Sequence, residues 1–231
     1  MKKLYTGKTK DVYEIESGEF AGEYLLQFKD DACGENGVFD PGANQIGLTI
    51  DGKGKAGLQV TEFFFGKINE AGERTHFINC DVEKAQMTVR PATVFGKNGV
   101  EVICRYKAFG SFVRRYGQFI SEGTPLDALV EITLKDDERG DPLVTKETLA
   151  ALNILTENEY DVVVSLAKKI CGVIKGVLAE KSLELIDIKL EFGKGKDGEV
   201  MLIDEVSGDI MRVFKDGKSV TPLELTSLLL G

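Results

Sequence analysis

Short alternating runs of apolar residues dominate the first 95 residues of the chain. Aliphatic and aromatic side chains gather in runs separated by Gly, Asp and Asn, a pattern typical of β-strands joined by turns. Four such runs fall at residues 12–15, 24–28, 75–78 and 87–89. Between them, apolar residues recur at helical spacing over residues 57–71, which predicts one helix. Residues 36–55 carry many glycines and little periodicity, which indicates a loop or irregular strands.

The rest of the chain alternates strands with helices. Four strands are predicted over residues 100–105, 129–134, 183–192 and 199–205, with short helices over 110–115 and after 221. The clearest helix spans residues 157–181, where Thr156 and Glu159 can form a capping box. Its apolar stripe is predicted to consist of Val162, Leu166, Ile170, Val173 and Val177. A boundary near residues 90–98 divides the chain into lobes of residues 1–95 and 96–231.

Composition narrows the class of protein. The chain has 231 residues, of which 42% are hydrophobic and 29% charged, as in ordinary soluble proteins. No apolar run approaches the roughly 20 residues that cross a bilayer, and the first residues carry no apolar leader, so we expect a cytoplasmic protein without a membrane partner. The four cysteines lie far apart, which favours reduced thiols. The net charge of −9 argues against nucleic-acid binding.

One strand carries an unusual row of charges. Residues alternate along a strand, so within 183–192 the side chains of Asp187, Lys189 and Glu191 share one face, opposite an apolar face. A glycine-rich turn over 193–198 follows, and the next strand ends in Asp204 and Glu205. Such a hairpin would gather Lys189, Glu191 and Asp204. Carboxylates can hold Mg²⁺ and an ammonium group can neutralise phosphate oxygens, so the hairpin predicts a metal–nucleotide site.

A second charged segment lies near the N-terminus. Gly7 is followed by Lys8 and Lys10 and then by a strand. A glycine turn in this position can lay N–H and ammonium groups over phosphates. The spacing of a Walker A loop is absent, and a plain basic hairpin is an equal alternative.

The third segment combines Arg105 with Gly110 and Ser111. N–H groups at a helix start, a hydroxyl and a guanidinium suit a phosphate or carboxylate. The alternative is that Arg105 forms a surface ion pair and Ser111 caps a helix. His76 is the only histidine and lies in a strand-like run, so we expect a structural histidine. Catalysis should then depend on carboxylates, lysines and a metal ion.

Taken in order, these segments resemble the SAICAR synthetase family, also called phosphoribosylaminoimidazole-succinocarboxamide synthase. The resemblance covers residues 4–216. Its motifs are the Y-x-G-K-x-K-x-V-Y segment over residues 5–13, Arg105 with Gly110-Ser111, Lys135-Asp136-Asp137, Asp141-Pro142, Asp187-x-Lys189-x-Glu191-Phe-Gly193, Asp204-Glu205 and Arg212.

The resemblance implies an α+β fold in which an N-terminal antiparallel β lobe packs on a larger α/β lobe. ATP would lie in the cleft between them, as in protein kinases and ATP-grasp enzymes. The implied enzyme is a ligase of de novo purine biosynthesis. It joins the carboxylate of carboxyaminoimidazole ribotide (CAIR) to the amine of L-aspartate, through an acyl phosphate, giving SAICAR, ADP and phosphate. The family often forms homodimers.

The resemblance also implies a role for individual residues. ATP would be held by Gly7, Lys8, Lys10, Val12, Lys135, Glu191 and Asp204. Mg²⁺ would be held by Glu191 and Asp204. Catalysis is assigned to Lys189, Asp204 and Lys135. The substrates would be bound by Arg105, Gly110, Ser111, Asp136, Asp141 and Arg212.

Some positions depart from the family pattern. Gly140 stands where the family usually has histidine, and residues 207–214 lack the usual proline and tryptophan. Two alternatives follow from these departures. One is a paralogue that ligates a different acid and amine, and the other is an ATP-binding module with little catalysis.

Overall fold

The computed structural model describes residues 1–35, 37–43 and 45–231. Within these residues the strands form two larger antiparallel sheets and one small sheet. The first sheet has the order β1 (Lys2–Thr6), β2 (Lys10–Glu14), β3 (Tyr24–Phe28), β8 (Gln86–Val89), β7 (Phe77–Asp81). The small sheet has the order β5 (Val38–Phe39), β4 (Asp31–Glu35), β6 (Ile46–Thr49).

The large sheet carries most of the C-terminal part of the chain. Its order is β11 (Pro125–Leu134), β10 (Val100–Lys107), β12 (Glu184–Lys194), β14 (Met211–Lys215), β15 (Lys218–Ser219), and both β9 (Thr93–Val94) and β13 (Val200–Ile203) pair with β12. The helices are α1 (Lys53–Glu70), α2 (Ser111–Tyr116), the 3₁₀ turn η1 (Asp137–Arg139), α3 (Lys146–Ala151), α4 (Glu157–Glu180) and α5 (Pro222–Leu230). This arrangement of an antiparallel β lobe beside a larger mixed lobe confirms the predicted α+β class.

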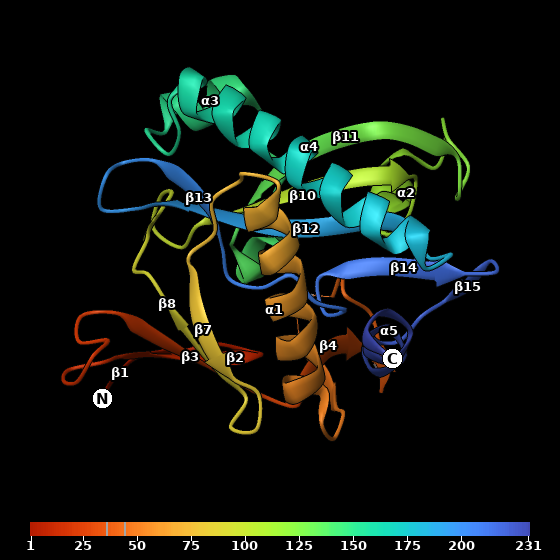
Figure 1. The fold of residues 1–231 in the computed structure, drawn as a ribbon. Helices are drawn as coiled ribbons and strands as arrows, with labels where there is room; N and C mark the ends of the chain where they lie inside the picture. Colours follow the sequence, from red (N-terminus) through yellow and green to blue (C-terminus); the bar gives the residue numbers. More distant parts are fainter. Residues whose placement is uncertain (36, 44) are drawn as a thin grey trace.

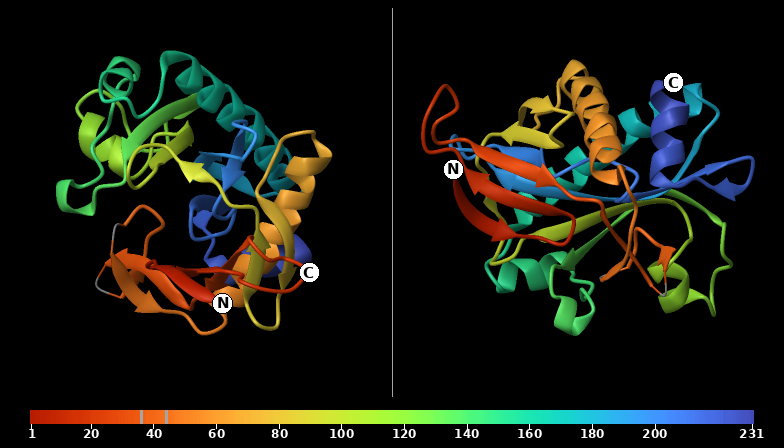
Figure 2. Two further views of the ribbon diagram at one scale, coloured as in Figure 1. Left: turned by 90° about the vertical axis from the view of Figure 1, so that its left-hand side faces the viewer. Right: turned by 90° about the horizontal axis from the view of Figure 1, so that it is seen from below.

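Helices α1 and α4 contribute to the core, and α1 contacts elements of both lobes. Helix α4 packs on β10, β11 and β12, while α1 contacts α4, α5, β3 and β7. In Figure 1, α4 crosses the large sheet and α1 descends from it toward the first sheet. The same core of buried side chains includes Leu26 of the first sheet, Phe64 of α1 and Leu190 of the large sheet. Figure 2 shows the N-terminal strands lying opposite the large sheet.

Local sequence signals predicted the positions of the helices well, but the buried face predicted for α4 is partly wrong. The capping box of Thr156 and Glu159 is present at the start of α4. Helix α1 begins at Lys53 rather than at residue 57. The stripe predicted for α4 is wrong at Val162, which is 42% exposed, whereas Val163 is buried. Successive side chains of a helix point about 100° apart around its axis. The face of α4 that packs on the sheet therefore includes Val163 and not Val162.

Strand pairing joins the two lobes close to the predicted boundary. The backbone N–H of His76 donates to the carbonyl oxygen of Leu202 at 3.0 Å, and β9 pairs with the end of β12. The division into residues 1–95 and 96–231 stays a prediction, and the pairing of β9 attaches residues 93–94 to the large sheet. Among the described residues, no helix combines the length and apolarity needed to cross a membrane.

Candidate active site

A cleft of about 1020 Å³ opens between the first sheet and the large sheet. It brings together every residue that the family resemblance assigned to the nucleotide. These residues are Gly7, Lys8, Lys10, Val12, Lys135, Glu191 and Asp204. Lys189, Asp136 and Asp141 also line the cleft.

The turn between β1 and β2 presents the side chains of Lys8 and Lys10 to the cleft, whereas the backbone N–H of Gly7 is not available there. The Gly7 N–H donates to the carbonyl oxygen of Lys10 at 2.8 Å, so it is used within the turn. A Cβ on Gly7 would lie 2.6 Å from that same oxygen, which explains why glycine is required. Lys8 contacts Asp137 at 2.6 Å in an exposed ion pair. Exposed pairs of this kind are weak, so Lys8 can exchange Asp137 for a phosphate.

Two carboxylates of the cleft, those of Glu191 and Asp204, repel each other through their negative charges. Glu191 accepts from Lys135 at 2.7 Å, and Asp204 lies 3.2 Å from the Lys10 ammonium group. Burial and the neighbouring Asp204 raise the pKa of Glu191. Burial acts in the same direction on Asp204, but Lys10 and Lys135 outweigh it and lower the pKa of Asp204.

The donor chemistry of this pair suits Mg²⁺. Hard cations prefer carboxylate oxygens, and Mg²⁺ is typically bound through one or two carboxylates together with substrate phosphates. In the described part of the chain, no three Asp, Glu, His or Cys side chains cluster as a complete metal site. Asp204 also adopts a left-handed backbone conformation with φ 65°. Strained non-glycine backbone of this kind is concentrated at functional sites.

Lys189 has a partner that the sequence did not indicate. Its ammonium group donates to Glu101 at 2.8 Å, and the other oxygen of Glu101 accepts from Thr133 at 3.0 Å. The predicted gathering of Lys189 with Glu191 and Asp204 holds for the cleft as a whole, but the close ion pair is with Glu101. Glu101 lies directly opposite Glu191 in the register of β10 and β12, which only strand pairing could reveal.

His76 is buried, with 5% of its surface exposed. Its Nε2 lies 3.1 Å from the carbonyl oxygen of Asp204. Burial lowers the pKa of His76 to about 4. The neutral ring therefore supports the backbone at Asp204, as expected for a structural histidine.

The buried ring predicts a pH dependence of stability. The unfolded histidine has a pKa near 6.5, so between pH 6.5 and 4 the unfolded chain binds a proton that the folded chain does not. Above pH 6.5 this effect does not reduce the free energy of unfolding. We expect acidification to about pH 4 to lower the free energy of unfolding by up to about 3 kcal/mol. Urea unfolding at a series of pH values measures this loss. The His76→Gln variant should lack this part of the slope, and an identical slope would contradict the assignment.

A smaller pocket of about 100 Å³ adjoins the cleft. Four residues predicted to bind substrate, Arg105, Ser111, Asp141 and Arg212, line it. Asp141 and Lys189 line both spaces and therefore mark where they meet.

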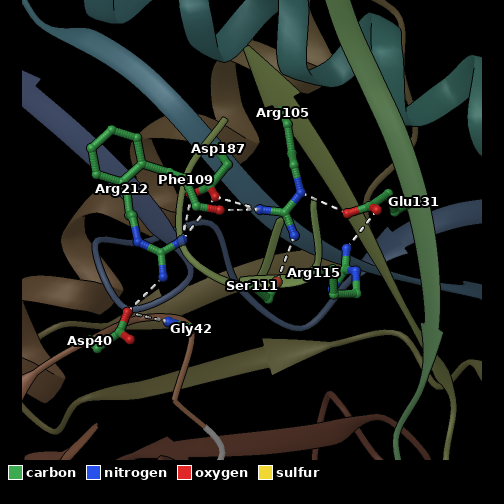
Figure 3. A network of polar contacts seen from close by, with 9 residues as sticks. All are labelled: Asp40, Gly42, Arg105, Phe109, Ser111, Arg115, Glu131, Asp187 and Arg212. Carbon is green, nitrogen blue, oxygen red and sulfur yellow. Dashed lines mark hydrogen bonds and ion pairs between the residues drawn. The ribbon is translucent and has the colours of Figure 1, made fainter. Parts of the chain in front are cut away.

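Arg105 lies at the centre of a buried ion-pair network (Figure 3). It is 1% exposed. Its Nε donates to Glu131 at 2.7 Å, its Nη1 to Asp187 at 2.8 Å and its Nη2 to the Ser111 hydroxyl at 2.9 Å. The surface ion pair weighed as an alternative is therefore a buried network instead. Sequence reasoning missed Glu131, which lies on the neighbouring strand β11 and meets Arg105 only through sheet pairing.

Arg212 continues the network toward the first lobe. Its Nη1 donates to both oxygens of Asp187, at 3.0 and 2.8 Å, and its Nη2 donates to Asp40 at 2.7 Å. Gly110 has a φ of 55°, and a Cβ there would lie 2.8 Å from Nη2 of Arg212. The glycine thus allows the backbone to approach the guanidinium group directly.

The sequence also did not predict a second buried ion pair. Lys53, the first residue of α1, is 1% exposed and pairs with Asp209. Burial raises the pKa of Asp209 to about 6, and its Oδ1 has no hydrogen-bond partner among the described residues. Lys53 falls inside the segment that the sequence indicated as irregular, so no periodic signal marked it as buried.

Two of the departures from the family pattern have local explanations. Gly140 follows η1 with φ 69°, a conformation that glycine adopts without strain. At Gly208, a Cβ would lie 2.8 Å from the Cα of Pro222, so the start of α5 leaves no room for a larger residue. Gly140 also lines the smaller pocket, so this departure lies on the substrate side of the site.

Comparison with known proteins identifies the family. The family model for SAICAR synthetase matches residues 3–223. A phosphoribosylaminoimidazole-succinocarboxamide synthase from Clostridium tetani is 54% identical over 231 residues, which is 100% of both chains. The crystal structure of this synthase from Ehrlichia chaffeensis has a TM-score of 0.83 and 28% identity, covering 100% of this chain and 92% of that chain. A SAICAR synthetase in complex with ADP has a TM-score of 0.80 and 30% identity, covering 93% and 86%. The chain therefore belongs to the SAICAR synthetase family.

Proposed function

We propose that the two adjoining spaces divide the family's reaction between them. The reaction is the ATP-dependent ligation of CAIR and L-aspartate to SAICAR in purine biosynthesis, and it is the activity of this chain. The larger cleft takes ATP, and the smaller pocket takes the ribotide through Arg105, Ser111 and Arg212. The observation that carries this proposal is that Asp141 and Lys189 line both spaces. A carboxylate held in the smaller pocket can therefore meet a phosphate held in the larger one. The ADP bound to a related synthetase supports nucleotide use.

The chemistry needs an activated carboxylate. Transfer of the γ-phosphoryl group to the CAIR carboxylate gives ADP and an acyl phosphate, which splits one difficult step into two easier ones. The aspartate amine then attacks the carbonyl carbon, the amide bond forms and phosphate leaves with the bonding electron pair. Phosphoryl transfer depends mainly on positioning and charge neutralisation. Lys8, Lys10, Lys135 and Lys189 line the cleft and supply the positive charge.

We propose Mg²⁺ as the metal ion, held by Glu191 and Asp204. When bound, it would neutralise negative charge on the phosphate oxygens. Lys135 and Lys10 hold these two carboxylates in place before the nucleotide enters. Asp136 lies beside Asp141, with its N–H donating to the Asp141 carboxylate at 2.8 Å, and we assign this pair to substrate contacts at the junction.

Phosphate release tests the proposal directly. We expect release from ATP only when Mg²⁺, CAIR and L-aspartate are all present, with SAICAR formed in equal amount. Omitting each component in turn, and adding a chelator, should abolish release. Turnover with another amine in place of aspartate would favour a paralogue with a different acid and amine pair. Nucleotide binding without any turnover would favour a weakly catalytic module.

Two further assignments stay predictions. The four cysteines Cys33, Cys80, Cys104 and Cys171 are free thiols, which supports the proposed cytoplasmic location. A homodimer is proposed from the family resemblance, and light scattering coupled to size-exclusion chromatography would measure the mass of the particle in solution.

A further inference from the structure

The smaller pocket is lined by four arginines, and three of them are paired with carboxylates of the protein. In order along the network (Figure 3), these groups are Arg115, Glu131, Arg105, Asp187, Arg212 and Asp40. Each of the carboxylates Glu131 and Asp187 bridges two arginines. The network therefore alternates in charge from α2 across the sheet to the first lobe.

Asp40 differs from the other two carboxylates in burial and position. Glu131 is 8% exposed and Asp187 is 3% exposed, and both lie on strands of the large sheet. The side chain of Asp40 is 39% exposed and lies on the connection between β5 and β6. Removing a strand carboxylate from its arginines would leave a buried charge unpaired, whereas Asp40 can turn into water at little cost. Asp40 is thus the one anion of the network that a ligand can displace.

The fourth arginine, Arg114, has no carboxylate partner in the part of the chain that the structure describes. It lines the pocket from α2 and is exposed, and among the described residues no acidic side chain pairs with it. Its charge nevertheless acts on Asp40. Burial works against the charge of Asp40, but the Gly42 N–H, Arg212 and Arg114 together lower the pKa of Asp40. Arg114 and Arg212 therefore both attract the anion at this position.

We propose that, in the free protein, Asp40 occupies the position that the ribotide phosphate takes in the complex. When the ribotide binds, its phosphate displaces Asp40 and binds to Arg212 and Arg114. This inference rests on the proposed function of the pocket. The charges support the exchange. With Asp40 withdrawn, the three arginines of the network exceed its two carboxylates, Glu131 and Asp187, by one positive charge, and Arg114 beside the network adds a second. A phosphate monoester carries about −1.5 to −2 near pH 7, so it neutralises the network better than one carboxylate does.

The exchange involves the backbone beside Asp40 as well. The Gly42 N–H donates to the same Asp40 oxygen at 2.9 Å. A Cβ on Gly42 would lie 2.4 Å from Nη2 of Arg212, so this backbone rests directly on the guanidinium group. When the Asp40 side chain turns away, both the Gly42 N–H and Nη2 of Arg212 lose their bond to its Oδ1 and become available to the phosphate. Ribotide binding is thereby coupled to the contact between this first-lobe segment and Arg212.

Two substitutions with opposite expected effects test the exchange. Ribose 5-phosphate, a fragment that carries the phosphate, is titrated calorimetrically against the full-length protein. Asp40→Asn should tighten its binding about tenfold, because the competing charge is gone. Arg114→Gln should weaken binding about tenfold, because one charge-assisted hydrogen bond is lost. ADP binding should change in neither variant, and Asp216→Asn on an exposed turn serves as the matched control.

The outcomes separate this inference from the proposed function. Weaker binding in Asp40→Asn would show that Asp40 contacts the ligand directly, and unchanged binding in Arg114→Gln would remove Arg114 from the site. Either result overturns the exchange while leaving the pocket assignment standing. Failure of the wild-type protein and of Asp40→Asn to bind ribose 5-phosphate, with ADP binding intact, would overturn the pocket assignment and the exchange with it.

Discussion

Replacing Asp204 with Asn is expected to lower turnover by about two to three orders of magnitude while the protein stays folded. The carboxylate is one of two groups proposed to hold Mg²⁺, and it also balances the buried ammonium group of Lys10 at 3.2 Å. Asn keeps the shape of the side chain and tolerates the left-handed conformation at φ 65°, so the backbone should not change. Phosphate release at saturating ATP, CAIR and L-aspartate measures the loss.

Asp216→Asn is the matched control for this variant. Asp216 also has a positive φ, of 50°, and lies exposed at the turn between β14 and β15. Its turnover and unfolding midpoint should equal those of the wild type. Turnover of Asp204→Asn close to the wild-type rate would contradict the metal-ligand assignment. A loss of turnover that merely follows a loss of folded protein would point to a structural role instead.

Replacing Arg105 with Ala is expected to lower the free energy of unfolding by about 3–5 kcal/mol. Arg105 is 1% exposed and its guanidinium group bonds to both Glu131 and Asp187. Truncation would leave these two buried carboxylates with fewer partners, and an unpaired buried charge is costly. Urea denaturation followed by circular dichroism measures the change, and it should appear in the absence of any ligand.

Arg114→Ala provides the comparison. Arg114 lines the same pocket but is exposed and has no carboxylate partner in the described part of the chain, so its removal should change stability by no more than about 0.5 kcal/mol. If Arg105→Ala kept wild-type stability and lost only ribotide binding, the proposed contribution of the buried network to stability would be contradicted. Equal losses in the two variants would contradict the distinction drawn from burial.

Part of the proposed nucleotide side could be predicted from the sequence, because the hairpin of β12 and β13 depends on local signals. Alternation along β12 placed Lys189 and Glu191 on one face, and the following strand ended just before Asp204, as the turn between them indicated. The capping box at Thr156 likewise fixed the start of α4. Each of these features depends on residues within a few positions of each other, so spacing alone determines which side chains meet.

The substrate side depended on contacts between distant segments. The sequence by itself determined the fold class and the family resemblance, and it indicated part of the cleft lining, including Lys189, Glu191 and Asp204. Only the tertiary structure decided that Arg105 would meet Glu131 and Asp187, that Lys53 would pair with Asp209, and that Asp40 would reach Arg212. The physical reason is that a charge in a low-dielectric interior selects whichever opposite charge packing brings within hydrogen-bond distance. No local pattern in the chain specifies that partner.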